Sequence, residues 1–461
     1  MSTVNVIDFI YLISAILFML GIKNLSSPAT AKLGNKLSMT GMGVAIIATL
    51  ASPDMFGYTM IIIAIAIGAA IGGYAAVKVE MTSMPEMVAL FNGCGGAASA
   101  MVAIAEYSGT ASDAFAGFTI ITLLLSIIIG SLTFTGSIIA YTKLQGIIST
   151  RPITYVGQQI VNAGIVLATV FLAYLVFQNP ANGFAFYTII LLSLGLGVLA
   201  VIPIGGADMP VIVSLLNSYS GLAVSMTGFA LNNNALIIVG SLVGASGLFL
   251  TKIMCDAMNR SLANVLFGAF GAIDDSVQEE GEGPAGSMKG FDVEDVAIAV
   301  ENAETVIIVP GYGMAAAQAQ HVTRELGDYL MGEGIDVRYA IHSVAGRMPG
   351  HMNVLLAEAD VSYDQLFAME DINDDFSTTD VVLVIGANDV VNPAAKTNPS
   401  SPIYGMPVLN VEEAQTVVVL KRSMNVGFAG IENELFYKDN TMMLFGDAKD
   451  SIQKLLSAVK E

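Results

Sequence analysis

The sequence predicts a polytopic helical membrane bundle, residues 1–260, followed by a soluble Rossmann-like α/β domain with a doubly wound parallel sheet, residues 291–461. Three observations predict this fold class. Apolar stretches of about 20 residues, long enough to cross a bilayer, recur through the first part of the chain. Charge is unevenly divided, because residues 1–260 hold 8 Lys+Arg and 8 Asp+Glu, whereas residues 261–461 hold 11 and 31. Strand-like runs then alternate with helical patterns.

Composition excludes several classes of protein. A mean hydropathy of +0.69 and a charged fraction of 13% are unlike an average soluble protein. The net charge of −20 lies in the second part and argues against nucleic-acid binding. The two cysteines, Cys94 and Cys255, lie in apolar segments, so we expect neither a metal cluster nor a structural disulfide.

Nine apolar stretches of spanning length make up the predicted bundle. They are residues 4–22, 37–53, 57–77, 86–105, 115–141, 158–178, 184–203, 209–230 and 234–255. Gly68-x-x-x-Gly72 and Gly240-x-x-x-Gly244 are small-residue pairs of the kind that lets helices approach closely.

The distribution of basic residues supports nine spans and gives an orientation. Every Lys and Arg of the first 260 residues falls on one side: Lys23, Lys32, Lys36, Lys78, Lys143, Arg151, Lys252 and Arg260. The opposite side carries only acidic residues: Asp8, Asp54, Glu106 and Asp113. The positive-inside rule therefore predicts an N-terminus outside and a cytoplasmic C-terminal domain.

Residues 261–290 separate the two domains as an acidic, Gly-containing linker. Asp292 can cap a short helix that runs to about residue 302. We predict strands at 305–310, 335–341, 380–386, 404–410, 416–421 and 441–445. We predict helices at 313–331, 349–359, 363–370, 411–415 and 447–459.

A Gly-x-Gly-x-x-Ala turn, Gly311, Gly313 and Ala316, follows the first of these strands and precedes a helix. This strand–turn–helix layout cradles the pyrophosphate of a dinucleotide. The first glycine is expected to make the tight turn, the second to admit the phosphates, and the helix N-terminus to attract the anion. Taken alone the pattern is weak, since Gly-x-Gly also occurs in ordinary turns.

The end of the second strand predicts which nucleotide binds. A site for NAD places an Asp or Glu there, but this strand ends in Ile341-His342-Ser343, and Arg347 follows. This favours a phosphorylated ribose, and so NADP. Lys421-Arg422-Ser423, at the end of a later strand, is a second candidate for the phosphate monoester, or else a solvated charge pair.

Three further soluble residues remain open between two roles. Asp389, in the segment Gly386-Ala387-Asn388-Asp389, either contacts the nicotinamide or ribose or builds an Asx turn. His342 and His351 are either cofactor contacts or polar loop residues.

Polar side chains in the spans are candidates for a proton pathway. Asn92, Gly96, Ser99 and Glu106 fall on one helical face, and Glu86 lies near the inner end of that span. Asp208 lies in a Gly-Gly turn, and Asn217 follows in the next span. Such groups usually line a pathway, although hydrogen bonding between helices is an equal alternative for any single Asn or Ser.

Long segments of the sequence resemble the β subunit of proton-translocating NAD(P) transhydrogenase. They are G-G-A-D-M-P-V-I-V-S-L-L-N-S-Y-S-G (205–221), P-G-Y-G-M-A-A-A-Q-A-Q (310–320), V-A-G-R-M-P-G-H-M-N-V-L-L-A-E-A (344–359), I-N-D-D-F (372–376), V-I-G-A-N-D-V-V-N-P-A-A (384–395), K-R-S-M-N (421–425) and L-F-G-D-A-K (444–449). The resemblance covers essentially the whole chain.

The resemblance implies that this chain binds NADP(H) and that an α subunit of one or two chains carries NAD(H). It implies hydride transfer from NADH to NADP⁺ of Re/Si specificity, coupled to inward proton movement, in a dimer of αβ units in a prokaryotic inner membrane. No side chain acts as a covalent or acid–base catalyst, and no metal is implied. Our alternative is a transporter or channel that a cytosolic NADP-sensing domain regulates.

The resemblance also assigns residues to the cofactor. Residues 311–316 hold the pyrophosphate, Arg347 contacts it, and residues 427–430 form a lid over the cofactor. Lys421, Arg422 and Ser423 hold the 2′-phosphate. The full expected set is Gly311, Tyr312, Gly313, Met314, Ala315, Ala316, His342, Gly346, Arg347, Met348, Pro349, Gly386, Ala387, Asn388, Asp389, Lys421, Arg422, Ser423, Gly427, Phe428, Ala429, Gly430 and Asp447.

Two departures from the family pattern matter. Some members carry a proton-relay histidine where this chain has Asn92, and others carry one in an earlier span, yet no predicted span here contains His. Either Asn92 orders water for the proton, a carboxylate such as Glu86, Glu106 or Asp208 titrates instead, or coupling is weak. Phe428 also stands where tyrosine is frequent in the family.

Overall fold

The computed structural model describes residues 3–25, 28–51, 57–79, 83–109, 117–149, 152–267, 289–348, 350–401, 403–427 and 429–461. The chain forms two compact units, Met1–Thr251 and Lys252–Glu461. Of the sequence expectations, Asp54, Asp113, Arg151, Pro349, Phe428 and most of the linker 261–290 lie outside the described residues.

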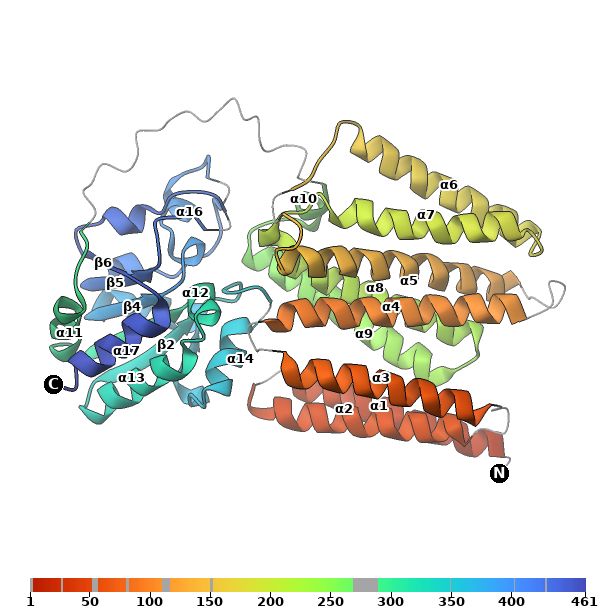
Figure 1. The fold of residues 1–461 in the computed structure, drawn as a ribbon, viewed down its shortest axis with the longest axis horizontal. Helices are drawn as coiled ribbons and strands as arrows, with labels where there is room; N and C mark the ends of the chain where they lie inside the picture. Colours follow the sequence, from red (N-terminus) through yellow and green to blue (C-terminus); the bar gives the residue numbers. More distant parts are fainter. Residues whose placement is uncertain are drawn as a thin grey trace. The chain divides into compact units, whose positions relative to one another are not determined.

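Unit 1 is built from long apolar helices (Figure 1). They are α1 Thr3–Leu25, α2 Pro28–Leu50, α3 Tyr58–Lys78, α4 Met84–Gly109, α5 Gly117–Leu144, α6 Gln158–Gln178, α7 Gly183–Val201, α8 Met209–Ala230 and α9 Asn234–Ala257. Proline opens α2 and lies in the first turn of α4 and α8, where its missing N–H costs no hydrogen bond.

Eight of these helices are long and apolar enough to cross a membrane, which is consistent with the nine predicted spans. The ninth, α2, is the least apolar, because it begins at Pro28 rather than at residue 37 and so includes Lys32 and Lys36. The first loop was therefore predicted too long. Lysine is a good helix former, and its long side chain can keep its charge outside the apolar layer.

The centre of unit 1 is α5, which packs on α4, α7 and α8. Close approach of backbones at glycine permits this packing. A Cβ added to Gly130 would lie 2.6 Å from Gly96 O, and one added to Gly221 would lie 2.7 Å from Gly240 O. The predicted contact face at Gly240 and Gly244 is thus used within the chain.

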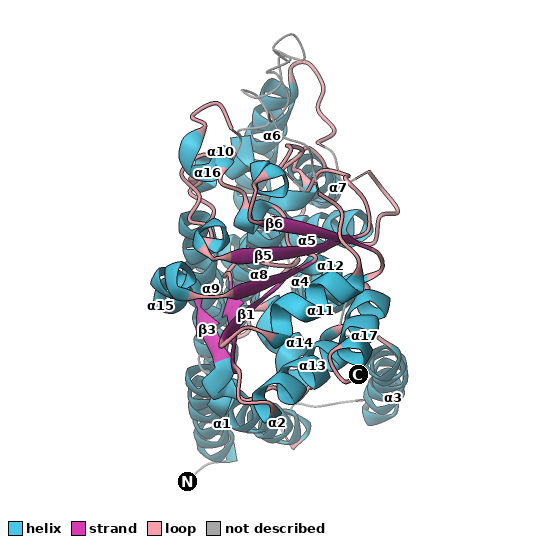
Figure 2. Cartoon of the chain, turned by 90° about the vertical axis from the view of Figure 1, so that its left-hand side faces the viewer, coloured by secondary structure: helices cyan, strands magenta, loops and turns pink. Residues whose placement is uncertain are grey.

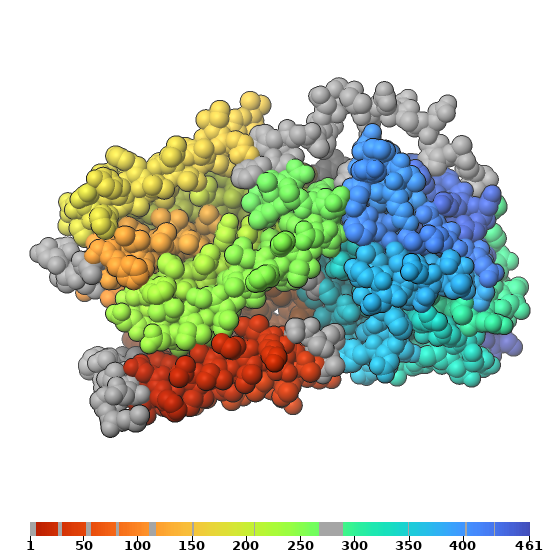
Figure 3. Space-filling view, turned by 180° about the vertical axis from the view of Figure 1, so that it is seen from behind, coloured from red at the N-terminus to blue at the C-terminus, as the bar shows by residue number. Residues whose placement is uncertain are grey.

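Two helices form a layer of their own, and one stands apart. α1 packs on α2, and the pair is the red layer of Figure 3. Along α3 no residue is buried, and a Cβ at Gly68 or Gly72 would meet nothing within 4 Å among the described residues. The expected close approach at Gly68 and Gly72 is therefore not made inside this chain.

Unit 2 contains a six-stranded parallel sheet in the order β3-β2-β1-β4-β5-β6 (Figure 2). The strands are β1 Thr305–Pro310, β2 Asp336–Ile341, β3 Leu366–Ala368, β4 Val381–Ile385, β5 Thr416–Lys421 and β6 Thr441–Phe445. This is the predicted doubly wound Rossmann order, with its switch point between β1 and β4. The register aligns Val306 with Val381 and Val417 with Thr441.

Helices cover one face of the sheet and irregular segments cover the other. The helices are α10 Leu262–Phe267, α11 Val293–Glu301, α12 Tyr312–Ala316, α13 Gln320–Gly332, α14 His351–Glu358, α15 Met369–Ile372, α16 Ala394–Thr397 and α17 Ala448–Ala458. α11, α13 and α17 pack together on one face. The opposite core joins alternate strand residues such as Val309 and Val384 to Phe376, Val411 and Phe436.

Three local predictions were wrong. Residues 363–370 contain the short edge strand β3 rather than a helix, because pairing with β2 overrides their weak helical pattern. Residues 404–410 form no strand, because Gly405 has a positive φ of 78° and Pro407 lacks an N–H. The helix predicted at 313–331 is two helices, separated at Gln318, whose φ is +50°.

Candidate functional site

The two loops at the switch point meet backbone on backbone. Gly311 N donates to Ile385 O (2.9 Å), and Gly313 N donates to Gly386 O (2.9 Å). A Cβ on Gly311 would lie 2.4 Å from Ala387 Cα, and one on Gly386 would lie 2.3 Å from Gly313 Cα. Close packing of the two loops therefore requires these glycines. The sequence motif was found, but the reason given for its first two glycines was wrong.

The helix that follows the Gly-x-Gly turn is short. α12 contains only Tyr312–Ala316, and Met314 and Ala315 are buried in it. Only a few N–H groups are available at its start, so the expected dipole of one long helix is not present. Anion binding at this edge must therefore depend on side-chain cations.

Arg347 is the nearest cation to the Gly-x-Gly turn. Its guanidinium carbon lies 4.2 Å from the centroid of the Tyr312 ring. Its backbone N donates to His351 Nδ1 (3.1 Å), and Gly346 adopts a φ of +102° directly against the His351 ring. The fully buried His351 thus shapes the loop that carries Arg347.

Neutral His351 is required for this arrangement. Burial, and then the charge of Arg347, lower its pKa to about 4, well below its usual 6.5. Because the folded-state pKa is depressed, this contribution to stability is complete above pH 6.5 and is lost as pH falls toward 4. We expect the unfolding temperature of the purified full-length chain to fall by roughly 5 °C between about pH 6.5 and 5.

The variant His351→Gln should show a shallower fall of the unfolding temperature over the same range. His321→Gln is the matched control, because His321 is 57% exposed and only pairs with Glu358 (3.3 Å). Equal slopes for wild type and His351→Gln would contradict the assignment.

His342 uses both ring nitrogens within the protein. Nε2 contacts Pro407 O (2.7 Å), and Nδ1 accepts from Val344 N (3.2 Å). Burial lowers its pKa, so the ring is neutral. His342 therefore connects the end of β2 to the 404–410 segment, and a cofactor could reach only the ring carbons.

Asp389 and Asn388, at the end of β4, are tied to the predicted lid. Asp389 Oδ2 accepts from Ala429 N (3.0 Å), and a Cβ on Gly427 would lie 2.4 Å from Asp389 Oδ1. Asn433 Nδ2 donates to Asn388 O (3.0 Å) and Asn388 Oδ1 (3.1 Å). Of the two roles left open for Asp389, the geometry supplies a contact that holds the lid.

Two lid residues were missed from the sequence. Asn433 is 1% exposed, and the fully buried Asn392 donates to Glu432 O (2.9 Å). A run of amides around a strand end, Asn388, Asn392 and Asn433, is the signal that could have indicated them.

Lys421 and Arg422 lie on the same side of this edge, at the end of β5. Lys421 Nζ lies 4.7 Å from the centroid of the Phe436 ring, and burial lowers its pKa. Lys421 lines a small pocket of about 120 Å³ together with Asn388, Val426 and Asn433. Arg422 and Ser423 are exposed, and neither makes a hydrogen bond or ion pair with any described residue.

Most other cations of unit 2 are already paired with carboxylates. They are Lys289, Arg324, Arg338, Lys396 and Lys438. Arg422 is therefore available for an anionic ligand in an otherwise acidic domain.

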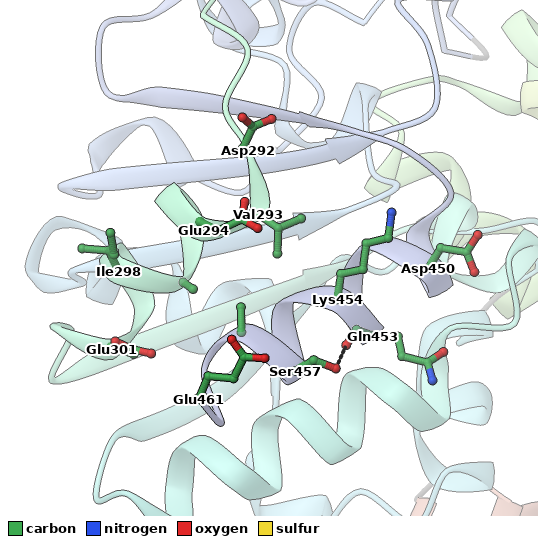
Figure 4. Close-up of a pocket in the computed structure, with 12 residues that line it drawn as sticks. Asp292, Val293, Glu294, Ile298, Glu301, Asp450, Gln453, Lys454, Ser457 and Glu461 are labelled. Carbon is green, nitrogen blue, oxygen red and sulfur yellow. Dashed lines mark hydrogen bonds between the residues drawn. The ribbon is translucent and has the colours of Figure 1, made fainter.

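The largest surface groove of unit 2, about 790 Å³, lies between α11 and α17 (Figure 4). It is lined by the carboxylates of Asp292, Glu294, Glu301, Asp450 and Glu461 and by a single Lys454. Phosphate groups would be repelled there. The smaller strand-end site, although less hollow, has the appropriate charge.

In unit 1, Asn92 joins three helices. Its Nδ2 donates to Ser137 Oγ on α5 (3.1 Å), and its Oδ1 accepts from Ser220 Oγ on α8. Further along the same helices, Ser126 Oγ and Thr227 Oγ1 are 2.7 Å apart. A polar column thus runs between α4, α5 and α8, although Ser137, Ser220, Ser126 and Thr227 were not among the predicted site residues.

The other predicted membrane residues differ in their surroundings. Glu86 is buried at the start of α4, and Glu106 is half-buried near its end. Ser99 Oγ donates to Gly95 O within its own helix (3.1 Å). Asn217 is half-buried, and Asp208 lies at the N-cap of α8.

Comparison with known proteins decides the family. The model of the NAD(P) transhydrogenase beta subunit family matches residues 7–458. The NAD(P) transhydrogenase subunit beta of Rhodospirillum rubrum is 50% identical over 456 residues, covering 97% of this chain and 98% of the relative. A second relative of the same description, from a named strain of that species, matches equally.

The chain belongs to the NAD(P) transhydrogenase beta subunit family.

Membership in the transhydrogenase beta subunit family gives the two units their broad roles. A nicotinamide nucleotide site is implied by the family description, and the strand-end edge of unit 2 has the Rossmann geometry for one. The description as a beta subunit also implies an alpha subunit partner. The apolar helices of unit 1 are those of a membrane protein.

Proposed function

We propose that this chain binds NADP(H) in unit 2 and conducts protons through unit 1 of a proton-translocating transhydrogenase. Hydride passes from NADH on a partner α subunit to NADP⁺ on this chain, and inward proton movement drives the transfer. The complex is a dimer of αβ units in a prokaryotic cytoplasmic membrane. The N-terminus of this chain lies outside, and unit 2 lies in the cytoplasm.

The observation that carries the choice of nucleotide is the pair Lys421 and Arg422. β2 ends without a carboxylate for a ribose 2′-hydroxyl, whereas β5 ends with an exposed arginine that has no partner among the described residues. The donor set therefore fits a 2′-phosphate. Ser423 adds a hydroxyl, and Arg347 adds a cation for the pyrophosphate beside the turn of residues 311–316.

Each part of the edge then has a task. The glycine contact between residues 311–313 and 386–387 forms a fixed floor, with Tyr312 supporting Arg347. Asp389 and Asn388 hold the 427–430 lid over it. His342, Gly346, Met348, Pro349 and Asp447 remain proposed contacts or supports of the same site.

When bound, NADP(H) supplies the hydride acceptor or donor. The protein supplies positioning and electrostatics and needs no covalent catalyst. No group of three or more His, Cys, Asp or Glu among the described residues is arranged to hold a metal ion.

The polar column around Asn92 is the proposed route of the proton. Asn92, Ser137 and Ser220 can pass hydrogen bonds from α4 to α5 and α8, and Glu86, Ser99, Glu106 and Asn217 are further members of the proposal. Asp208 is assigned to coupling with unit 2. Full proton-driven NADPH formation in Asp208→Asn would remove it from that role.

Replacement of Asn92 by Leu is expected to lower proton-driven NADPH formation about tenfold, because the column loses a donor and an acceptor in an apolar medium. Membrane vesicles with a respiratory proton gradient measure this rate. Asn162→Leu is the matched control, because Asn162 lies on α6 and its Oδ1 makes no hydrogen bond among the described residues. Equal rates for both variants would contradict the route.

A direct test of the proposed function uses the full chain co-expressed with its α partner. NADH-dependent reduction of an NADP analogue should be seen by spectrophotometry, while the chain alone should bind NADPH without turnover. Binding of NADPH without turnover in a correctly assembled complex would instead favour a transporter or channel regulated by an NADP-sensing domain.

A further inference from the structure

Lys143 is a fully buried cation that the proposed proton route does not use. It lies in the last turn of α5 and has no exposed surface in the structure. The sequence placed it in a loop, but α5 continues to Leu144 and includes it. A charge buried in a membrane protein is costly, and such residues commonly have a functional task.

The ammonium group of Lys143 bonds to the end of another helix. Nζ donates to Ile202 O (2.5 Å) and to Ile204 O (2.7 Å). α7 ends at Val201, so these carbonyls belong to its unsatisfied, electronegative end. Ile153 N approaches the same Ile202 carbonyl at 3.4 Å. Lys143 thus fastens the carboxyl end of α7 to α5.

The fastened carbonyls immediately precede the turn that carries Asp208. Gly205 follows Ile204, Asp208 caps α8, and α8 then continues to Ser220 in the polar column. α5 itself carries Ser137, six residues before Lys143 and so about 9 Å away along the helix axis. Lys143 therefore connects the α7–α8 turn to the helix that carries the column.

We propose that Lys143 is a positioning residue for proton coupling. Its charge holds residues 202–208 in place against α5, so that the start of α8 and Asp208 keep a fixed relation to the Asn92 column. This inference rests on the proposed function of unit 1. It assigns no proton to Lys143 itself.

A purely structural helix cap would give a different result from a positioning residue. Loss of a cap alone would lower the amount of folded protein but leave the ratio of proton-driven to uncoupled hydride transfer unchanged. Loss of a positioning residue would lower that ratio in the protein that does fold. The ratio is therefore the decisive measurement.

The experiment compares Lys143→Met, Lys143→Gln and Lys143→Arg in membrane vesicles with the α partner present. Hydride transfer is measured with a respiratory proton gradient and again after an uncoupler, and NADPH affinity is measured in parallel. Lys143→Met should lower the coupled-to-uncoupled ratio about tenfold, Lys143→Gln by less, and Lys143→Arg by less than twofold, with NADPH affinity unchanged.

Lys78→Met is the matched control, because Lys78 also lies in the last turn of a spanning helix, α3, but is exposed. It should keep the wild-type ratio. If Lys143→Met fails to accumulate, Lys143→Gln decides alone, since its amide can still donate to one of the two carbonyls.

A wild-type ratio in every accumulating Lys143 variant would overturn the inference, and so would equal losses of coupled and uncoupled transfer. Failure of the proposed function is recognised separately, because the wild-type complex would then show no hydride transfer or no response to the proton gradient.

Discussion

The double variant Lys421→Ala/Arg422→Ala is expected to bind NADPH about 100-fold more weakly than wild type, by loss of two charge-assisted contacts to the 2′-phosphate. Titration of NADPH fluorescence with the full-length chain measures the change. Binding of NADH, which lacks that phosphate, should be weak and change less than twofold. The affinity loss should also diminish as ionic strength rises, because Arg422 is exposed.

Lys449→Ala/Lys454→Ala is the matched control for the double variant. It removes the same charge from unit 2, but from α17, and should leave NADPH affinity within twofold. Arg422→Ala alone separates binding from folding, since Arg422 makes no contact whose loss would destabilise unit 2. Equal losses of NADPH and NADH affinity in the double variant would place the 2′-phosphate elsewhere.

Gly386→Ala is expected to destabilise unit 2 by about 3–5 kcal/mol. Alanine is disfavoured at the Gly386 φ of +67°, and its Cβ would overlap Gly313 Cα at 2.3 Å, where only a shift of both loops could relieve the contact. The unfolding temperature of the purified chain should fall by roughly 10 °C. NADPH binding should be lost in the same variant, because the floor of the site is displaced.

Gly332→Ala is the control for this substitution. Gly332 ends α13, and an added Cβ there would meet nothing within 4 Å among the described residues. Its unfolding temperature should be unchanged or slightly raised, because alanine favours the helix. Wild-type stability of Gly386→Ala would mean that the two loops are less tightly packed than the structure indicates.

The fold class was predictable because its signals are long and repeated. Nine helices were indicated by stretches of about 20 apolar residues, and β1, β4, β5 and β6 by runs such as Val306-Ile307-Ile308-Val309. Errors arose where tertiary contacts decide local structure. Leu366 pairs with Tyr339 in β3, and Pro407 bonds to His342, and neither contact leaves a trace in local sequence.

The candidate site was predictable in position but not in its internal bonding. Strand ends in a parallel sheet share one edge, so Gly311, Gly386 and Lys421 were expected together. That Gly313 packs on Gly386, or that Asn433 bonds to Asn388, depends on contacts between residues 45 or more positions apart. Lys143 was placed in a loop because its charge, read alone, is typical of one.

Main-chain atoms packed directly on one another leave the seam between β1 and β4 no freedom to open. A side chain can change rotamer, but the 2.9 Å bonds from Gly311 and Gly313 to the β4 loop can break only if the sheet itself parts there. The amides of Asn433 and Asn392, by contrast, can rotate away without disturbing a strand. The residence time of a bound nucleotide is therefore adjustable on the lid side alone, while the surface that orients its reactive ring stays constant from one turnover to the next.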